Sequence, residues 1–180
     1  MLIAVFSLLL SFAHATGTVT LSADDGTKVY GRTSTVRNAK RGVVFVHMLG
    51  RDGKDWKSLM ERLRTSGVST IAIDLRGHGQ SSKAGTDLTE ADFLAMGAEL
   101  RAGADWLRAE GVTEVSCVGA SIGANLCTQF AAADPSVVNL ILLSPGLNYK
   151  GVKSGNALIA YGNRPVMIVA SEDDRFAFRA

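Results

Sequence analysis

The sequence is poor in the residues that build metal centres and disulfide-rich scaffolds. Among its 180 residues are two cysteines, Cys117 and Cys127, and three histidines, His14, His47 and His78. Their spacing is not that of a zinc site, so we expect no metal centre. The cysteines fall on a predicted strand and on the helix that follows it, and both point by pattern into the core. We therefore expect free buried thiols and no disulfide.

The chain also lacks a marked excess of charge of either sign. Its 19 basic and 17 acidic side chains leave a net charge of +2. The densest basic cluster, Lys28 to Arg41, falls in a predicted hairpin, where a solvated sheet edge explains it better than a nucleic-acid surface does. We therefore expect no nucleic-acid partner.

No internal repeat and no long linker divides the chain, and 47% hydrophobic residues fit one globular domain. Residues 1–15, "MLIAVFSLLLSFAHA", are uncharged and end in the small-x-small signature of a cleavage site. This stretch is too short to span a membrane well, so a membrane anchor is the weaker interpretation. We interpret it as a signal peptide without the usual basic region, which predicts a secreted or periplasmic domain of residues 16–180 with no membrane contact after cleavage.

The remaining sequence alternates between strand and helix patterns. Residues 18–36 contain two alternating runs around Asp24-Asp25-Gly26, which predicts an antiparallel hairpin. Apolar runs typical of strands buried on both faces follow: "GVVFVHM", "STIAIDL", "EVSCVGA", "VVNLILLS" and "RPVMIVAS". Helical periodicity covers residues 55–66, 89–110, 122–133 and 156–161. This order predicts an α/β fold, a doubly wound and mostly parallel sheet with an N-terminal antiparallel hairpin.

One predicted strand ends in a motif that favours catalysis. Residues Gly119-Ala120-Ser121-Ile122-Gly123 fit the pattern G-x-S-x-G between a strand and a helix. The turn is so tight that the residues two before and two after the serine must be small, and glycine supplies both. The amino end of the helix would favour negative charge that develops at the hydroxyl. The alternative is a serine N-cap between two glycines that pack the helix.

Four motifs in this order resemble the α/β-hydrolase family, in its serine esterase and lipase branch. "VVFVHMLGRDGKDW" resembles the third strand and the oxyanion loop, although His47-Met48 stands where the family usually has His-Gly. "IAIDLRGHGQS" resembles the fourth strand and its loop, "VGASIGA" the nucleophile elbow, and "PVMIVASEDD" the seventh strand with the triad acid. The resemblance runs from Thr18 to Asp174 and implies an enzyme without a cofactor.

The resemblance also implies a role for each matching residue. Ser121 would be the nucleophile, and the backbone amides of Leu49 and Ile122 would form the oxyanion hole. Asp174 fits the triad acid better than its neighbour Asp173 does, and the alternative is that this acidic cluster is only a solvated loop. His47 would brace the oxyanion loop.

The catalytic base is the part that the sequence does not supply. In the family a histidine follows the acid, but none follows Asp174 here, so we expect the chain to lack a final strand, the histidine and a closing helix. His78 follows a strand two places from the elbow, about 10 Å away at about 4.8 Å per strand, so we expect His47 and His78 to make structural hydrogen bonds. The alternative is a natural short form that self-associates through the open edge of its last strand.

The substrate class is only loosely bounded. A short segment, residues 145–163, separates the last two predicted strands, so we expect an open site without a large lid that suits small or short-chain carboxylic esters. A serine in the elbow argues against the branches that use aspartate or cysteine there. Thioesterase, lactonase, amidase and perhydrolase chemistry stay open, and so does a non-catalytic binding protein on the same fold.

Overall fold

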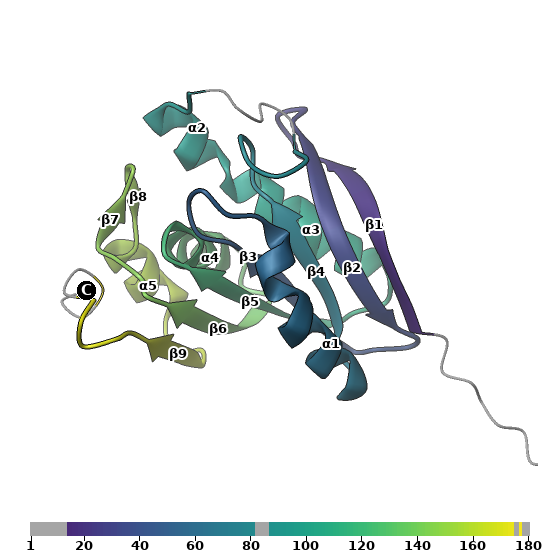
Figure 1. The fold of residues 1–180 in the computed structure, drawn as a ribbon. Helices are drawn as coiled ribbons and strands as arrows, with labels where there is room; N and C mark the ends of the chain where they lie inside the picture. The colour runs from purple at the N-terminus through teal and green to yellow at the C-terminus, as the bar shows by residue number, and fades with distance from the viewer. Residues whose placement is uncertain (1–13, 82–86, 175–176, 178–180) are drawn as a thin grey trace, which may run out of the picture.

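The computed structural model describes residues 14–81, 87–174 and 177. The main sheet has seven strands in the order β1-β2-β4-β3-β5-β6-β9 (Figure 1). Strands β1 and β2 form an antiparallel hairpin at one edge of the sheet, and β2 also pairs antiparallel with β4. The other pairs are parallel. The bounds are β1 His14–Ser22, β2 Lys28–Val36, β3 Arg41–Val46, β4 Ser69–Asp74, β5 Glu114–Ala120, β6 Val137–Leu143 and β9 Val166–Val169. The α/β class and the mostly parallel sheet predicted from the sequence are confirmed.

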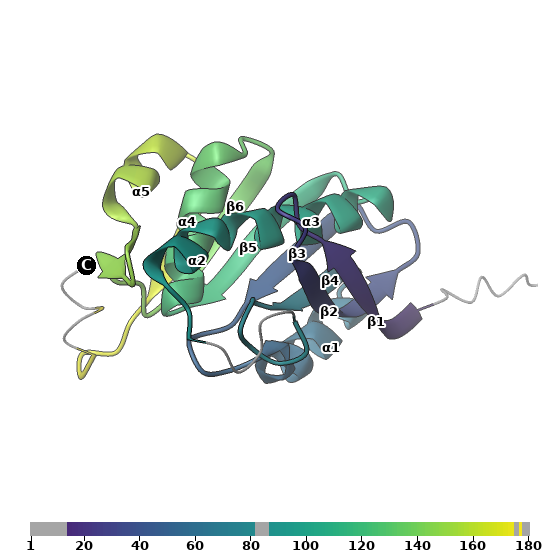
Figure 2. The same ribbon diagram turned by 90° about the horizontal axis from the view of Figure 1, so that it is seen from above.

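Helices cover the sheet from both sides. The short helix η1 (Gly53–Trp56) leads into α1 (Lys57–Thr65) on one face, and α3 (Gly97–Ala109), α4 (Ile122–Ala133) and α5 (Gly155–Tyr161) lie on the other (Figure 2). Each crossover between parallel strands has to return along the sheet, which a helix does most simply. The larger core cluster fills the space under α3 and α4, and a smaller one lies under α1.

Two local features differ from the predicted elements. The helix expected over residues 89–110 is two helices, α2 (Glu90–Ala95) and α3, because the Met96 amide bonds back only three residues, to the Phe93 carbonyl. A small hairpin, β7 (Asn148–Tyr149) and β8 (Val152–Lys153), lies where only a loop was expected. Its turn residues, Lys150 and Gly151, both have positive φ, as in a type I′ turn, and strands of two residues are too short to show a sequence pattern.

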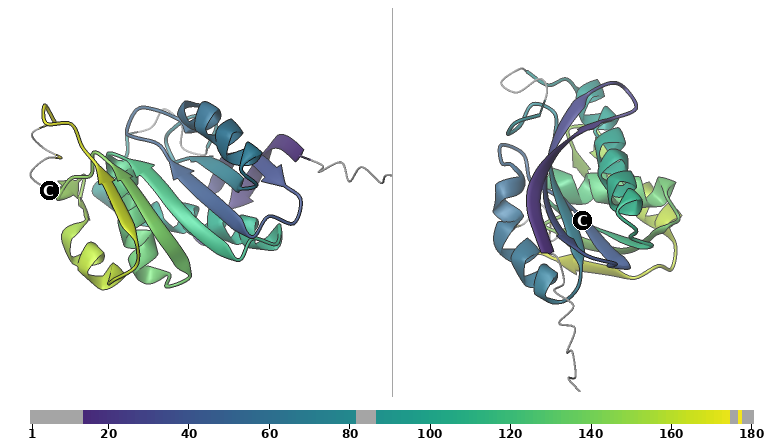
Figure 3. Two further views of the ribbon diagram at one scale, coloured as in Figure 1. Left: turned by 90° about the horizontal axis from the view of Figure 1, so that it is seen from below. Right: turned by 90° about the vertical axis from the view of Figure 1, so that its right-hand side faces the viewer.

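Strand β9 is the least covered part of the sheet. Its sequence is typical of burial on both faces, but Val166, Met167, Ile168 and Val169 are 43–58% exposed. Seen from below, β5, β6 and β9 lie open beside α1 (Figure 3), where a cavity of about 390 Å³ is lined mainly by apolar side chains. In the described residues no strand pairs with the outer edge of β9 and no helix covers this face, which agrees with the open edge expected for this strand.

The N-terminal prediction falls mostly outside the described residues. Residues 1–13 hold most of the expected signal peptide, and the description begins at β1. His14 and Ala15, at the expected cleavage point, pair with Val36 and Thr35 of β2. Within the described ranges, no helix has both the length and the apolar character needed to cross a bilayer.

Candidate active site

Ser121 lies on a strained turn between β5 and α4. Its φ of 54° and ψ of −121° are values that a residue with a side chain rarely adopts. The Ser121 amide donates to the Leu143 carbonyl of β6 (2.8 Å), and the Ser121 carbonyl accepts from Ala124 (2.9 Å). Although Ser121 holds the N-cap position of α4, its side chain makes no capping hydrogen bond. A serine kept only to cap the helix would make that bond, so the geometry favours the nucleophile over the N-cap alternative.

The two glycines of the motif are required by backbone contacts. A Cβ atom on Gly119 would lie 2.2 Å from the carbonyl oxygen of Gly123, far inside van der Waals contact. A Cβ atom on Gly123 would lie 2.5 Å from the Val46 carbonyl oxygen and 2.6 Å from that of His47. The elbow therefore folds onto itself and packs directly against the end of β3, where the oxyanion loop begins.

The candidate oxyanion donors are on the two sides of this contact. Ile122 is the first residue of α4, where amide groups have no partner within the helix. Leu49 lies in a turn that the Arg51 amide closes by donating to the Met48 carbonyl (3.2 Å), and Gly50 supplies the positive φ of 74° that this turn needs. Ile122 directly follows Ser121, and Leu49 lies two residues after the His47 carbonyl that Gly123 approaches. The role of both amides as oxyanion donors stays a prediction.

His47 is buried and uses both of its ring nitrogens. The Leu75 amide donates to Nε2 (3.0 Å), so Nδ1 carries the proton and donates to the Met48 carbonyl (2.8 Å). Burial lowers the pKa of His47, which is 1% exposed, so the ring is neutral at physiological pH. His47 ties the loop after β3 to the loop after β4, and it has no free nitrogen to take a proton from Ser121.

His78 belongs to the loop after β4, and β3 separates β4 from the elbow strand β5. Its ring centroid lies 5.0 Å from that of His47, and its Nδ1 lies 3.0 Å from the Arg76 carbonyl oxygen. Along this rim a polar cavity of about 520 Å³ is lined by Gly50, Arg51, Asp52, Lys54, Asp55, Gly77, His78 and Gly79. His78 therefore lines a space beside the oxyanion turn and not the elbow itself.

Asp174, the expected acid, lies in the loop after β9, two strands from β5. Its amide donates to the Ser171 carbonyl (3.0 Å), and its carboxylate accepts from the Ala177 amide (3.1 Å). Asp174 is half-buried, whereas Asp173 is exposed, which favours Asp174 of the two. The structure puts Asp174 on the same rim as Ser121, and its role as triad acid stays a prediction.

Comparison with known proteins places this geometry in a family. A family model described as "Serine aminopeptidase, S33" matches residues 37–175, which include the elbow, the oxyanion turn and Asp174. The chain belongs to this S33 family of α/β-hydrolases. An uncharacterized protein of Mycobacterium tuberculosis is 31% identical over 118 residues, 65% of this chain and 33% of that protein. The chain thus spans about a third of the length of this curated relative.

Solved structures resemble the S33 chain in fold. The Pyrococcus furiosus esterase Pf2001 has a TM-score of 0.63 at 22% identity, over 76% of this chain and 51% of the esterase. A predicted CIB-like hydrolase from Thermoplasma acidophilum has a TM-score of 0.65 at 19% identity, over 89% of each chain. At these identities the likeness shows the α/β-hydrolase fold alone.

The cysteines of the S33 chain differ from the expectation. Cys117 of β5 and Cys127 of α4 form a disulfide, with their Cα atoms 5.6 Å apart and both residues fully buried. The prediction of free thiols is wrong because the elbow folds α4 back against β5, so that the two core-facing side chains point at each other. The sequence showed that both are buried, but it did not show that they are opposed.

Sequence reasoning also missed the buried carboxylates that hold the rim. Asp74, at the end of β4, is fully buried and accepts from the Arg32 guanidinium, the Gly53 amide (2.8 Å) and the Gln80 amide (2.9 Å). It joins the loops that follow β3 and β4. The available signal was an acidic residue inside an apolar strand pattern, "IAIDL", since a buried carboxylate has to be paired.

A second buried ion pair holds the loop after β4 from the other side. The Arg76 guanidinium bonds to the buried Glu99 of α3 and to Asp25 in the β1–β2 turn. Burial raises the pKa of Glu99 against the opposing effect of Arg76. A hydrogen bond from the Thr27 amide, together with Arg76, lowers the pKa of Asp25 from 3.8 to about 2. The loop that carries His78 is thus anchored to a helix and to the hairpin.

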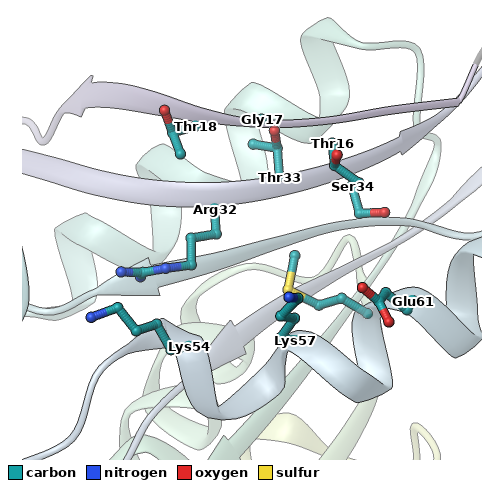
Figure 4. Close-up of a pocket in the computed structure, with 10 residues that line it drawn as sticks. Thr16, Gly17, Thr18, Arg32, Thr33, Ser34, Lys54, Lys57 and Glu61 are labelled. Carbon is teal, nitrogen blue, oxygen red and sulfur yellow. The ribbon is translucent and has the colours of Figure 1, made fainter.

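A separate cavity of about 470 Å³ lies between the β1–β2 hairpin and α1 (Figure 4). Arg32 and Lys54 lie at one end and Glu61 at the other. Arg32 pairs with Asp74, and Lys54 pairs with Asp52. The positive charges of Arg32 and Lys54 are therefore already balanced by carboxylates of this chain. Helix α4 begins on the opposite face of the sheet, so this cavity is not part of the Ser121 site. Within the described ranges no group of three metal-ligating side chains is present.

Proposed function

We propose that this S33 chain is a serine hydrolase that cleaves small or short-chain carboxylic esters through an acyl-enzyme on Ser121. The observation that carries the proposal is the strained backbone of Ser121, whose side chain makes no capping bond. Strain of this kind costs on the order of 1–3 kcal/mol and persists only where the surroundings enforce it. Here the close contacts of Gly119 and Gly123 enforce it.

The proposed reaction follows from the positions of the groups. The Ser121 hydroxyl attacks the acyl carbon, its proton passes to a base, and the amides of Ile122 and Leu49 donate to the oxyanion. The alcohol leaves with that proton, and water then cleaves the acyl-enzyme. Asp174 would orient a histidine base, and this base is not His47, because both of its nitrogens are occupied.

Exposed apolar side chains beside the elbow support an ester substrate with small apolar groups. Met48 and Leu49, after β3, are 43% and 45% exposed, and Leu147, after β6, is 56% exposed. Strand β5 lies between β3 and β6, so these side chains flank Ser121. The fold likeness to an esterase of Pyrococcus furiosus supports the same reaction class.

The test is covalent labelling of the 180-residue chain by a fluorophosphonate, measured by intact mass. Because the oxyanion amides retain part of the rate when the histidine is missing, we expect one slowly formed adduct on the native chain, none on Ser121→Ala, and an unchanged adduct on the control Ser66→Ala, which alters an exposed serine at the end of α1. Release of p-nitrophenol should be faster from the acetate than from the dodecanoate ester. Labelling that survives in Ser121→Ala would contradict the proposal.

One observation favours a second candidate, a non-catalytic binding protein on the same fold. Neither nitrogen of His47 is free, and the Nδ1 of His78 faces the Arg76 carbonyl. A chain of this kind would bind small esters with equal affinity before and after Ser121→Ala. Absence of any fluorophosphonate adduct together with such binding, measured by calorimetry with a non-hydrolysable ester analogue, would favour this candidate.

A further inference from the structure

The Cys117–Cys127 disulfide closes a covalent ring around the nucleophile elbow. Cys117 lies on β5 four residues before Ser121, and Cys127 lies on α4 six residues after it. The ring contains Gly119, Ser121 and Gly123, and therefore the close backbone contact between the two glycines of the strained turn. In the part of the chain that is described, this disulfide is the one covalent cross-link, besides the main chain through Ser121, between the strand and the helix.

Side-chain hydrogen bonds also hold the same helix on its other side. The buried Asn125 side chain donates to the carbonyls of Gly146 and Val152 and accepts from the Gly146 amide. These bonds fix α4 to the segment after β6. On the side of β5, the Cα atoms of Cys117 and Cys127 are held 5.6 Å apart, so the disulfide sets how closely the helix follows the strand.

We propose that this disulfide is a positioning element for Ser121, so that reduction of the bond slows the reaction of the serine while the domain stays folded. The inference rests on the proposed function, because it needs Ser121 to be the nucleophile. Contacts between neighbouring backbones offset the energetic cost of the strained elbow. These contacts weaken when α4 can move away from β5. A misplacement of about 1 Å can cost about 100-fold in rate.

The redox change is a simple exchange. A dithiol such as dithiothreitol gives two electrons and two protons, the bond between the sulfurs breaks, both cysteines become thiols, and the reagent closes to its own cyclic disulfide. Both cysteines are fully buried, so the reagent needs a brief exposure to mild urea, which is then removed. Intact mass reports the gain of two hydrogens.

The experiment compares the rate constant of fluorophosphonate labelling in the oxidised chain, in the reduced chain and in the double variant Cys117→Val/Cys127→Ala. Thermal melting by circular dichroism and hydrogen exchange at the amides of Ile122 and Gly123 are measured on the same samples. We expect labelling to slow about 10- to 100-fold, exchange at the elbow to speed up, and reoxidation of the reduced chain to restore both.

The control variant is Phe130→Leu, which alters a buried side chain of α4 outside the ring. It should lower the melting temperature without slowing the labelling, which separates positioning from a general loss of stability. Equal labelling rates with and without the bond would overturn the proposal, and so would unfolding of both disulfide-free forms, since the bond would then be purely structural. A native chain that takes no label at all would overturn the proposed function, and this inference with it.

Discussion

Strands β5 and β9 belong to the same parallel sheet, yet they differ in how firmly the structure holds them. In β5, Val115, Cys117 and Val118 are at most 6% exposed, whereas all four residues of β9 are at least 43% exposed. The loop after β5 contacts β3, β6 and its own helix, whereas Asp174, after β9, hydrogen-bonds to the nearby Ser171 and Ala177. The candidate nucleophile is therefore fixed by long-range packing, and the candidate acid by local chain geometry.

The largest effect is expected from Gly119→Ala, because the added methyl group would lie 2.2 Å from the backbone of Gly123. Neither group is the end of a flexible side chain, so the elbow has to open. We expect a loss of about 3 kcal/mol in the free energy of unfolding and no fluorophosphonate labelling. Urea unfolding measures the free energy of unfolding, and intact mass measures the labelling.

The matched control is Gly97→Ala at the start of α3, where an added Cβ meets nothing within 4 Å. Its unfolding free energy should change by less than about 0.5 kcal/mol. If Gly119→Ala behaved like this control, the elbow would be looser than the structure shows.

The next effect concerns Asn125, which is fully buried in α4. Asn125→Ala removes the side-chain partner of the Val152 carbonyl and of the Gly146 amide, while the Gly146 carbonyl keeps its bond from the Ser154 hydroxyl (2.7 Å). We expect the free energy of unfolding to fall by about 2–3 kcal/mol, because buried polar groups without a partner are destabilising. Urea unfolding measures this loss.

Gln129 offers a comparison one turn further along the same helix. Its side-chain amide also donates to a backbone carbonyl, that of Lys153 (3.0 Å), but water reaches this bond. Gln129→Ala should lower the free energy of unfolding by less than about 1 kcal/mol. Equal losses at the two positions would show that burial of the Asn125 bonds adds nothing.

The sequence predicts the features that depend on local patterns. The apolar runs locate the five parallel strands, and the G-x-S-x-G motif between strand and helix locates Ser121. The need for glycine at positions 119 and 123 follows from the tightness of the turn. These inferences hold because each uses residues that are close together in the chain.

Features that depend on distant residues were missed. The disulfide requires knowing how closely α4 returns to β5, and the buried pairs of Asp74 with Arg32 and of Arg76 with Glu99 join segments 42 and 23 residues apart. The exposure of β9 was expected only from the missing neighbours of this strand, since its own apolar pattern is typical of burial. A buried acidic residue in a strand predicts that a partner exists, but it does not say which residue is the partner.

A smaller effect is expected from pH at the β1–β2 turn. The pKa of Asp25 is lowered from 3.8 to about 2 by its bonds to the Thr27 amide and Arg76. A carboxyl with a lowered pKa stabilises the folded state above pH 4, and this contribution is lost as the pH falls through about 2. Because the side chain is 38% exposed, solvent screening limits the contribution to about 1 kcal/mol or less.

Asp25→Asn should therefore be less stable than the native chain at pH 6, and the difference should shrink between pH 4 and pH 2. Urea unfolding at several pH values measures it. Asp24→Asn is the control, because Asp24 is 81% exposed and its pair with Arg101 is 3.9 Å long. A difference for Asp25→Asn that stayed constant down to pH 2 would contradict the lowered pKa.

The smallest effect on stability is expected on β9. Met167 is 58% exposed, so Met167→Lys should change the unfolding free energy by less than about 0.5 kcal/mol. If the chain self-associates through this edge, the alternative that the sequence leaves open, a charge there should weaken the association, since lysine on exposed edges is a common means by which proteins prevent edge-to-edge pairing. Sedimentation velocity at rising concentration measures this, with Leu94→Lys on α2, 47% exposed, as the control. If both variants associate as the native chain does, the edge of β9 is not the contact, and the difference between β5 and β9 is one of rigidity alone.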